Sequence, residues 1–372
     1  MASKYNQQYN TLVNLFFILS FLSITYKYNI YVILLLVIGI FAISKKFKTS
    51  LSIILPLFLI PIIYFIEFGF NEFYRVEKTL LMIIPIGYII YYFRLKVSKI
   101  LIYFVNINVA FIYIEFILYH FLGITIFPDT TNTLGLLRHH AFFEDSNFFS
   151  YVLIAFIIYN KIISKKYNIF YIIALFISLS VSAIIIFFIL IFGLYIHQNY
   201  FKGYQKFIRI VAFVLTSFFV VLYYFAVMNN DKIQNLSDNP FVKFKLVSMS
   251  IRFDVQKKAI NTLIEKDSLL FGLGAGSARK LNDRNLNLHN TFLQIFVEIG
   301  LIGLLFVVVF CIFILFNIHI YFVSLWSVFI LLGNIMEVFY FPLLLFIFFL
   351  SNSYISKKGI KDEVFINNSN IR

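Results

Sequence analysis

The sequence predicts an all-α polytopic membrane protein, and three features of its composition lead to this fold class. Hydrophobic residues make up 61% of the 372 residues and charged residues 13%, whereas a soluble domain carries about 25% charged residues. The mean hydropathy is +0.90. The apolar residues also occur in long runs, and about 20 such residues can cross a bilayer as a helix.

Short polar or charged stretches divide the apolar runs into about twelve predicted transmembrane helices. The predicted helices cover residues 12–26, 28–43, 51–66, 79–93, 100–123, 148–163, 169–182, 184–196, 207–227, 291–316, 320–332 and 338–350. Basic clusters follow the second, fourth, sixth, eighth and twelfth of them. Several runs are shorter than a full span, so their boundaries are the least certain part of the prediction.

The distribution of basic residues predicts that both termini lie in the cytoplasm, because cytoplasmic loops carry an excess of Lys and Arg. This orientation assigns 17 of the 31 Lys and Arg residues to the cytoplasmic side. Only Asp362 and Glu363 oppose them there. The formal net charge of +14 is therefore explained by a basic rim on anionic lipid, and nucleic acid is not expected as a partner.

The chain reads as one transmembrane domain, 1–372, with two long outward loops. The first covers 124–147, and the second, 228–290, is expected to form a partly helical cap over the active site. Loops longer than about 15 residues are usually functional or disordered, and the second contains apolar, helix-compatible stretches. No internal repeat is evident, which argues mildly against a secondary transporter.

A polar stripe is predicted on the helix that follows the second loop. Asn290, Gln294 and Glu298 are four residues apart and share one helical face. An ionisable group as deep as Glu298 is a functional candidate, although a structural contact between helices explains it equally well. Gly300 and Gly303 would allow the close helix packing that such a contact needs.

His289 stands at the outward mouth of the same helix, where an imidazole and the positive helix end can both meet an anionic substrate. The preceding Gly-x-Gly-x-Gly run ends at Gly274 and Gly276. A dinucleotide fingerprint needs a strand before it and a helix directly after it, so we reject a nucleotide site. The glycines are expected to let the backbone approach another surface closely.

The first outward loop contains Arg138, which is its only basic residue and a candidate for binding phosphate. His139 and His140 are followed by Glu144 and Asp145, a set that could suggest a metal. Adjacent side chains diverge, however, and only His140 and Glu144 would share a helical face. A metal site is therefore not expected.

Three further ionisable residues lie in or beside apolar segments. They are Glu115 and His120 in the fifth predicted helix and Glu337 near the last helical hairpin. Each is expected to make a structural polar contact rather than to take part in catalysis.

The motifs together resemble the O-antigen ligase and polymerase superfamily, and most of all a Wzy-type polysaccharide repeat-unit polymerase. They are Arg-x-x-x-Phe-Phe-x-Asp-x-Asn at 138–147, Ser250 with Arg252, Phe-Gly-x-Gly-x-Gly at 271–276, and His-Asn-x-x-Leu-Gln-x-x-x-Glu-x-Gly-x-x-Gly at 289–303. Ala141 and Ser146 depart from the usual Gly and Pro of the first motif. Val181 stands where the superfamily often has an Arg that a ligase is expected to use, which favours a polymerase.

The resemblance implies a glycosyltransferase of the GT-C kind in the bacterial plasma (inner) membrane, with its active site on the outer face and no cofactor or metal. Its donor and acceptor would be glycans linked to undecaprenyl diphosphate, its product O-antigen or capsular or exopolysaccharide, and a chain-length regulator a further partner. His289 would be the catalytic base, and Arg252 and Arg138 would bind diphosphate. Substrate would be bound by Asn290, Gln294, Glu298, Gly274, Gly276 and Asn147. Two alternatives are a ligase with the same site and a flippase for lipid-linked oligosaccharides.

Overall fold

The computed structural model describes residues 2–22, 86–87, 89–91, 95–126, 137–143, 146–200, 204–229, 240–281, 288–334 and 340–358. The predicted helices 28–43 and 51–66 lie outside these residues, as does most of 79–93. Glu144, Asp145 and Glu337 lie outside them as well, so what we expect of these three residues stays a prediction.

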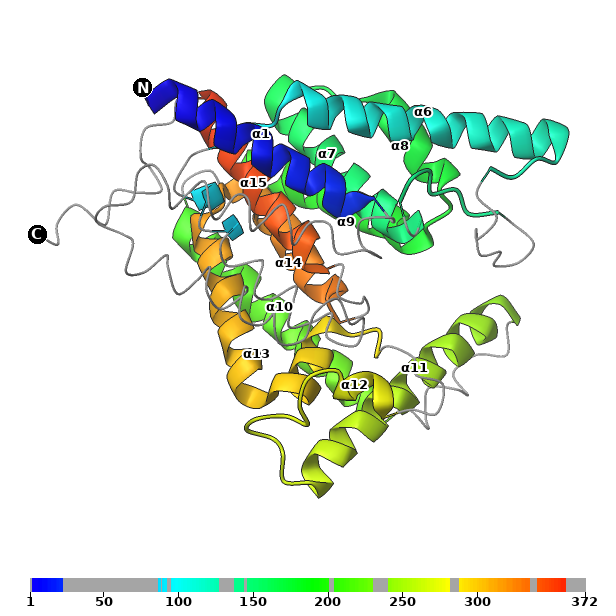
Figure 1. Cartoon of the computed structure of the whole chain (residues 1–372), viewed down its shortest axis with the longest axis vertical. Coiled ribbons are helices and arrows are strands. Elements are labelled where there is room, and N and C mark those ends of the chain that lie inside the picture. Colours follow the sequence, from blue (N-terminus) through cyan, green and yellow to red (C-terminus); the bar gives the residue numbers. More distant parts are fainter. Residues whose placement is uncertain are drawn as a thin grey trace, which may run out of the picture.

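The part of the chain that the structure describes folds into helices and turns, without a strand (Figure 1). The helices are α1 Ala2–Phe21, α6 Lys99–Leu122, α7 Ser146–Ser164, α8 Ile169–Ile177, α9 Val181–Tyr200, α10 Gln205–Met228, α11 Pro240–Glu265, α12 Ser277–Lys280, α13 Thr291–Asn317, α14 Val323–Leu332 and α15 Tyr340–Lys358. A 3-10 turn, η3, covers Ile320–Phe322. The α6, α7, α10 and α13 helices are long and apolar enough to cross a membrane. The predicted polytopic membrane fold is thereby confirmed.

The first and twelfth predicted helices, 12–26 and 338–350, cover Ala2–Phe21 and Tyr340–Lys358 in the structure, and two others are shortened or interrupted. The seventh, predicted over 169–182, ends at Ile177 in the structure, and α9 begins at Val181 after a break that contains Ser178 and Ser180. A nine-residue helix rises only about 13 Å, which is less than half of a bilayer core. The tenth predicted helix, 291–316, is interrupted at Gly300, where the backbone leaves the helical region.

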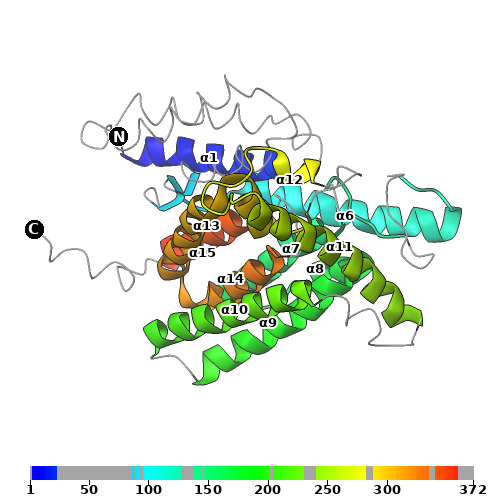
Figure 2. The same ribbon diagram turned by 90° about the horizontal axis from the view of Figure 1, so that it is seen from below.

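Aromatic side chains fill the centre of the helix bundle. The ring of Phe346 on α15 lies 5.0 Å from Phe17, 5.1 Å from Phe21 and 5.4 Å from Phe156, measured between centroids. Such edge-on and tilted pairs are the favoured geometries of aromatic rings. The short α14 packs against α9, α10 and α15, which joins the middle of the chain to its last helix (Figure 2).

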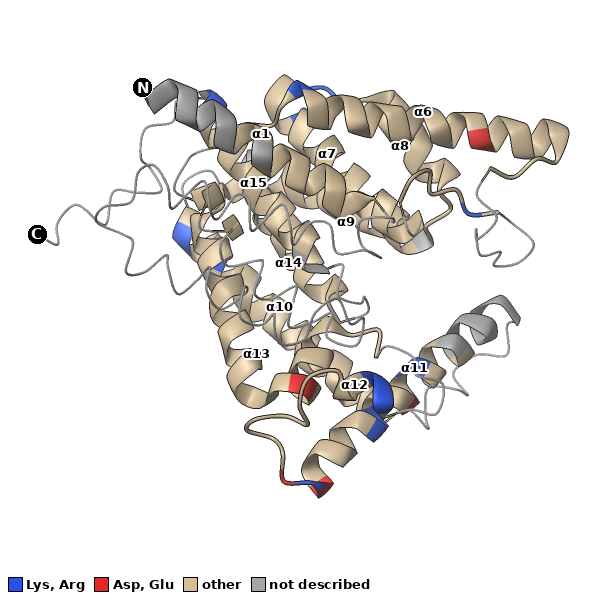
Figure 3. Cartoon of the chain, viewed as in Figure 1, with Lys and Arg blue, Asp and Glu red and all other residues tan. Residues whose placement is uncertain are grey.

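Figure 3 shows basic residues at the start of α6 and the end of α15, and a second group on α11 and α12. Ser353 on α15 accepts a hydrogen bond from the backbone N–H of Val97 at 2.9 Å, and its hydroxyl lies 2.8 Å from the Tyr159 hydroxyl on α7. At the start of α10, Arg209 donates to the carbonyl of Ile318 at the end of α13. The start of α13 and the end of α10 therefore lie toward the opposite end.

The α11 and α12 helices lie at that opposite end and pack against the first half of α13 (Figure 1). They share a small apolar core of their own, made of Ala259, Leu263, Ala278, Leu288, Leu293 and Val297. This core holds the segment with Arg252 against the segment with His289.

Candidate functional site

The start of α13 is fixed by contacts that begin at Asn290, its N-cap residue. The Asn290 side chain accepts a hydrogen bond from the backbone N–H of Leu293 at 2.9 Å, which satisfies a donor of the first helical turn. The next backbone N–H, that of Thr291, donates to the carbonyl of Gly333 at 2.8 Å. His289 directly before them is half-buried and has a φ of +49°. Non-glycine residues adopt this conformation rarely, and such strain is often found at functional sites.

A hydrogen-bond network surrounds the His289 backbone. The Asn290 amide donates to the Tyr224 hydroxyl at 3.3 Å, and the Gln256 amide donates to the Leu288 carbonyl at 3.0 Å. The Tyr223 hydroxyl donates to the side-chain carbonyl of Gln256 at 3.0 Å. Gln256 and Asn290 are both fully buried. The network therefore joins the ends of α10, α11 and α13.

Arg252 lies at the edge of this network. It precedes Gln256 by one turn of α11, its side chain is exposed, and its charge acts on Tyr223. We call Tyr223, Tyr224, Arg252, Gln256, His289 and Asn290 the His289 cluster. Sequence reasoning identified three of these residues and missed Tyr223, Tyr224 and Gln256. Tyrosines near the end of a membrane helix are typical of the interface, but Gln256 at four residues from Arg252 was a usable signal.

The two deeper residues of the predicted polar stripe contact each other. The Gln294 amide donates to Oε1 of Glu298 at 3.3 Å, and both side chains are buried, with 1% and 2% of their surface exposed. Within the described residues, the side-chain carbonyl of Gln294 has no hydrogen-bond partner. Gln294 and Glu298 therefore form a buried polar contact one to two helical turns beyond Asn290, and the Gln294 carbonyl oxygen can accept a further hydrogen bond.

The break in α13 is stabilised by the loop between α11 and α12. The backbone N–H groups of Leu273 and Gly274 donate to the carbonyls of Val297 and Glu298, at 2.7 and 3.2 Å. After the break, the N–H of Leu301 donates to the Leu269 carbonyl at 2.9 Å. The loop thus supplies partners to backbone groups that the broken helix leaves without intrahelical bonds.

Two glycines make this contact possible. A Cβ atom on Gly272 would lie 2.6 Å from the carbonyl carbon of Glu298, and one on Gly300 would overlap the Leu270 carbonyl oxygen. Both residues have a φ of +75°, a conformation open to glycine at little cost. The expected close approach of the glycine run is found here at Gly272, whereas a Cβ on Gly274 would meet nothing within 4 Å. Gly276 has a φ of +71° and is the N-cap residue of α12.

Arg138 belongs to a different group of residues. Its Nη2 donates to Oδ1 of Asn147 at 2.6 Å, and the Ser180 hydroxyl donates to the same oxygen at 2.7 Å. Two further contacts join α7 to the α8–α9 break, at 2.7 Å between the hydroxyls of Ser150 and Ser178 and at 2.9 Å between those of Tyr151 and Ser182. We call Arg138, Asn147, Ser150, Tyr151, Ser178, Ser180 and Ser182 the Arg138 cluster.

The two clusters occupy separate parts of the molecule. The His289 cluster is built on α10, α11 and α13, and the Arg138 cluster on α7, α9 and the segment before α7, which lie well apart in Figure 1. Among the described residues, no contact joins Arg138 to Arg252. The structure therefore places Arg252 near Tyr223, at the edge of the network around His289, and Arg138 against Asn147. The two arginines belong to separate groups of residues.

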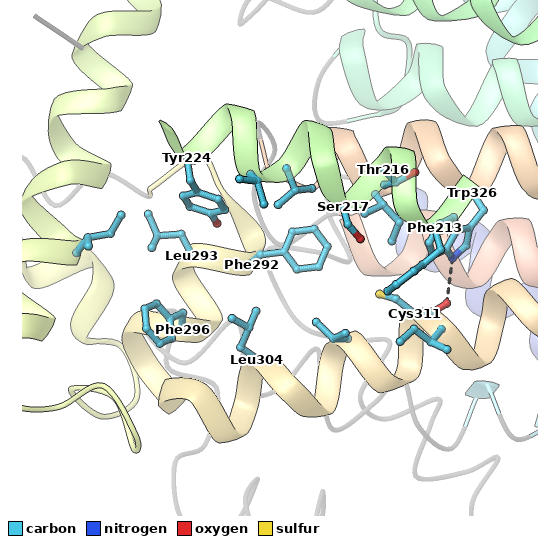
Figure 4. A pocket seen from close by; sticks show the side chains of 16 residues that line it. Phe213, Thr216, Ser217, Tyr224, Phe292, Leu293, Phe296, Leu304, Cys311 and Trp326 are labelled. Atoms are coloured by element: carbon cyan, nitrogen blue, oxygen red, sulfur yellow. Dashed lines mark hydrogen bonds between the residues drawn. The ribbon is translucent and has the colours of Figure 1, made fainter. Parts of the chain in front are cut away.

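An apolar cavity of about 460 Å³ adjoins the His289 cluster (Figure 4). It lies between α10, α13 and α14, and its walls include Phe213, Phe292, Phe296 and Trp326. Tyr224 lines the cavity and also accepts the hydrogen bond from Asn290, so the apolar space begins beside the polar network.

Comparison with known proteins gives one match. A family model described as O-antigen ligase matches residues 167–308, which run from the start of α8 into the second half of α13. No curated protein and no solved structure matches the chain. The matched segment contains the whole His289 cluster, whereas Arg138 lies outside it. Over this segment the chain is similar to the O-antigen ligase family, whose members are glycosyl-transferring enzymes.

Proposed function

We propose that the chain is a polymerase that joins polyprenyl-diphosphate-linked oligosaccharide repeat units into O-antigen or capsular or exopolysaccharide. The observation that carries this proposal is the His289 cluster, in which a histidine with a positive φ lies at a helix start between residues of a buried hydrogen-bond network, and an exposed arginine lies at the edge of that network. The family match covers every residue of that cluster.

In the proposed reaction, His289 acts as the general base. A hydroxyl of the acceptor sugar attacks the anomeric carbon of the donor glycan, and the bond from that carbon to the lipid diphosphate breaks. The hydroxyl proton passes to the imidazole of His289, the side chain that most often acts as a general base. Asn290 and Gln256 would hold the backbone on either side of His289, and Gln294 with Glu298 would orient sugar hydroxyls below it.

Arg252 would stabilise the leaving group. The lipid diphosphate gains negative charge as the glycosidic carbon departs, and a guanidinium offers forked donors that match phosphate oxygens. The exposure of Arg252 leaves room for a substrate at this edge of the cluster. No strong general acid is required, since a diphosphate leaves readily.

Arg138 would bind a second diphosphate, that of the acceptor. A polymerase handles two lipid-linked glycans at once, and the separation of the two arginines suits two diphosphates better than one. The acceptor diphosphate does not react, so Arg138 would contribute to binding and Arg252 to the chemical step.

The apolar cavity beside Tyr224 supports a lipid-linked substrate. Its walls are almost entirely hydrocarbon and aromatic, and it begins next to the polar network, so it can take the first part of an isoprenoid chain whose diphosphate lies near Arg252. The His289 cluster includes the end of α10 and the start of α13, at the opposite ends of these helices from the contact between Arg209 and Ile318. With basic residues facing the cytoplasm, the site would open to the outer face.

An elongation assay tests the proposal. Purified protein is incubated with a defined lipid-linked single repeat unit, and products are resolved by length. A polymerase gives a ladder of longer lipid-linked glycans. Transfer of a whole glycan to a different acceptor, with no ladder, would instead indicate a ligase, and the absence of any new glycosidic bond would favour the transporter alternative.

A further inference from the structure

The segment 137–143, which carries Arg138, is fastened to one face of α6. The backbone N–H of Phe142 donates to the side-chain carbonyl of Asn108 at 3.2 Å, and Nδ1 of His139 lies 3.3 Å from Oε2 of Glu115. Asn108 and Glu115 are seven residues apart, hence on the same helical face, and both are fully buried. The sequence predicted a structural contact for Glu115, and the structure supplies its partner from a loop.

Burying Glu115 and His139 costs desolvation free energy, which an apolar pair at these positions would not cost. Both side chains are at least 99% buried, and the His139 ring is enclosed by Phe116 and Tyr119, at centroid distances of 5.9 and 6.2 Å. Removing one member of such a pair leaves a buried polar group without compensation, whereas apolar residues of similar size would pack there at least as well. Within the described residues, His139 Nδ1 and the two Glu115 carboxylate oxygens have no hydrogen-bond partner, so their 3.3 Å approach is the polar contact that the structure gives them.

Arg138 comes directly before His139, and its side chain is directed to another helix. While His139 contacts α6, the guanidinium of Arg138 reaches Asn147 in the first turn of α7. Within the described residues, the Nε of Arg138 is buried and has no hydrogen-bond partner. A small shift of the segment along α6 would therefore move the guanidinium away from Asn147 and redirect its remaining donors.

We propose that Glu115 and His139 are positioning residues for Arg138. Their contact fixes the segment 137–143 on α6, so that the guanidinium held by Asn147 is in place to meet the phosphate oxygens of the acceptor lipid. The choice of ligand rests on the proposed function, whereas the positioning itself does not. Neither Glu115 nor His139 touches the substrate in this account.

The kinetic test compares Glu115→Gln in two backgrounds, with the single repeat unit varied against a fixed amount of elongated donor. In the wild-type background it raises the apparent KM by about tenfold and changes kcat little, as loss of a binding interaction should. In an Arg138→Lys background the same change adds less than about twofold, because the group it positions is already altered. Tyr159→Phe, which removes a buried hydroxyl contact at the other end of the bundle, leaves KM unchanged.

A second test does not depend on catalysis. Arg138→Cys is introduced into a Cys311→Ser chain, and the rate of reaction with a charged methanethiosulfonate is measured in membranes. Adding Glu115→Gln raises this rate about tenfold, because the segment is no longer held in place. Tyr103→Phe, an exposed residue on the same helix as Glu115, does not change the rate.

Equal effects of Glu115→Gln in both kinetic backgrounds, or an unchanged thiol reaction rate, would overturn the proposal. If Glu115→Gln reduces the amount of folded protein, Glu115→Asp replaces it, since that change keeps the carboxylate and shortens its reach. A wild-type protein that makes no ladder would refute the proposed function alone, and the thiol measurement would still decide whether the pair positions residue 138.

Discussion

The His289 cluster and the Arg138 cluster are positioned by different means. The former depends on backbone groups, because the loop after α11 fits into the break of α13 only where Gly272 and Gly300 let two backbones touch. The latter depends on side chains, because Asn147 links Arg138 to Ser180 while Glu115 and Asn108 hold the neighbouring residues. A backbone-positioned site tolerates little change of residue size, whereas a side-chain-positioned site tolerates conservative exchanges at a graded cost.

The largest loss of activity is expected from a change at Gly300, because only the His289 cluster is positioned by a backbone contact that requires glycine. Gly300→Ala places a Cβ against the Leu270 carbonyl and forces a φ that alanine avoids, so we expect a local cost of about 3 kcal/mol or more and near-complete loss of elongation. Gly193→Ala on α9 is the matched control, since its Cβ would lie 3.6 Å from Ser324 in ordinary contact. Elongation and protein level are measured for both. Normal elongation by Gly300→Ala would show that the break in α13 is not needed for activity.

The second prediction concerns Arg252 and Arg138, whose substitution by Lys should change different kinetic constants. Arg252→Lys keeps the charge but loses the forked geometry at the leaving group, so kcat should fall about 100-fold. Arg138→Lys should mainly raise the KM for the single repeat unit, by about tenfold. Steady-state kinetics on both variants measure this difference. Identical profiles would mean that both arginines serve the same diphosphate, and wild-type values for both would remove the diphosphate assignment.

The smallest effect concerns the buried pair below His289. Glu298→Gln preserves shape and can still accept the hydrogen bond from Gln294, so elongation should fall by about tenfold or less. Glu298→Ala, which removes the acceptor, should fall further. If Glu298→Gln alone abolished elongation while the protein stayed folded, Glu298 would be a proton-transferring group rather than an orienting one.

Sequence reasoning predicted the elements of the His289 cluster better than their geometry. Periodicity indicated a helix after His289 and placed Gln294 above Glu298, and these two residues do make contact. The break at Gly300 was not foreseen, because it depends on a loop more than 20 residues earlier in the chain that supplies the backbone partners. Local apolar periodicity contains no information about such a distant backbone contact.

The Arg138 cluster was harder to predict for a related reason. Its residues are short hydroxyl side chains on two helices and a loop, and serines in apolar helices usually bond to their own backbone. The partner of Glu115 lies 24 residues away in a loop, so no helical spacing could reveal it. The sequence therefore predicts contacts between residues of one helix, such as Gln294 and Glu298. It does not predict contacts between a helix and a distant loop, such as Glu115 and His139.

Whether the His289 cluster forms the glycosidic bond is decided by elongation with His289→Ala, using purified protein and a lipid-linked single repeat unit. Loss of a general base should lower the rate by about 100-fold to 10,000-fold, so single repeat units should remain unjoined. His120→Ala, an exposed histidine on α6, serves as the control and should give the wild-type ladder. A ladder of normal length and rate from folded His289→Ala would contradict the account, because the His289 cluster would then not be the place where the glycosidic bond forms.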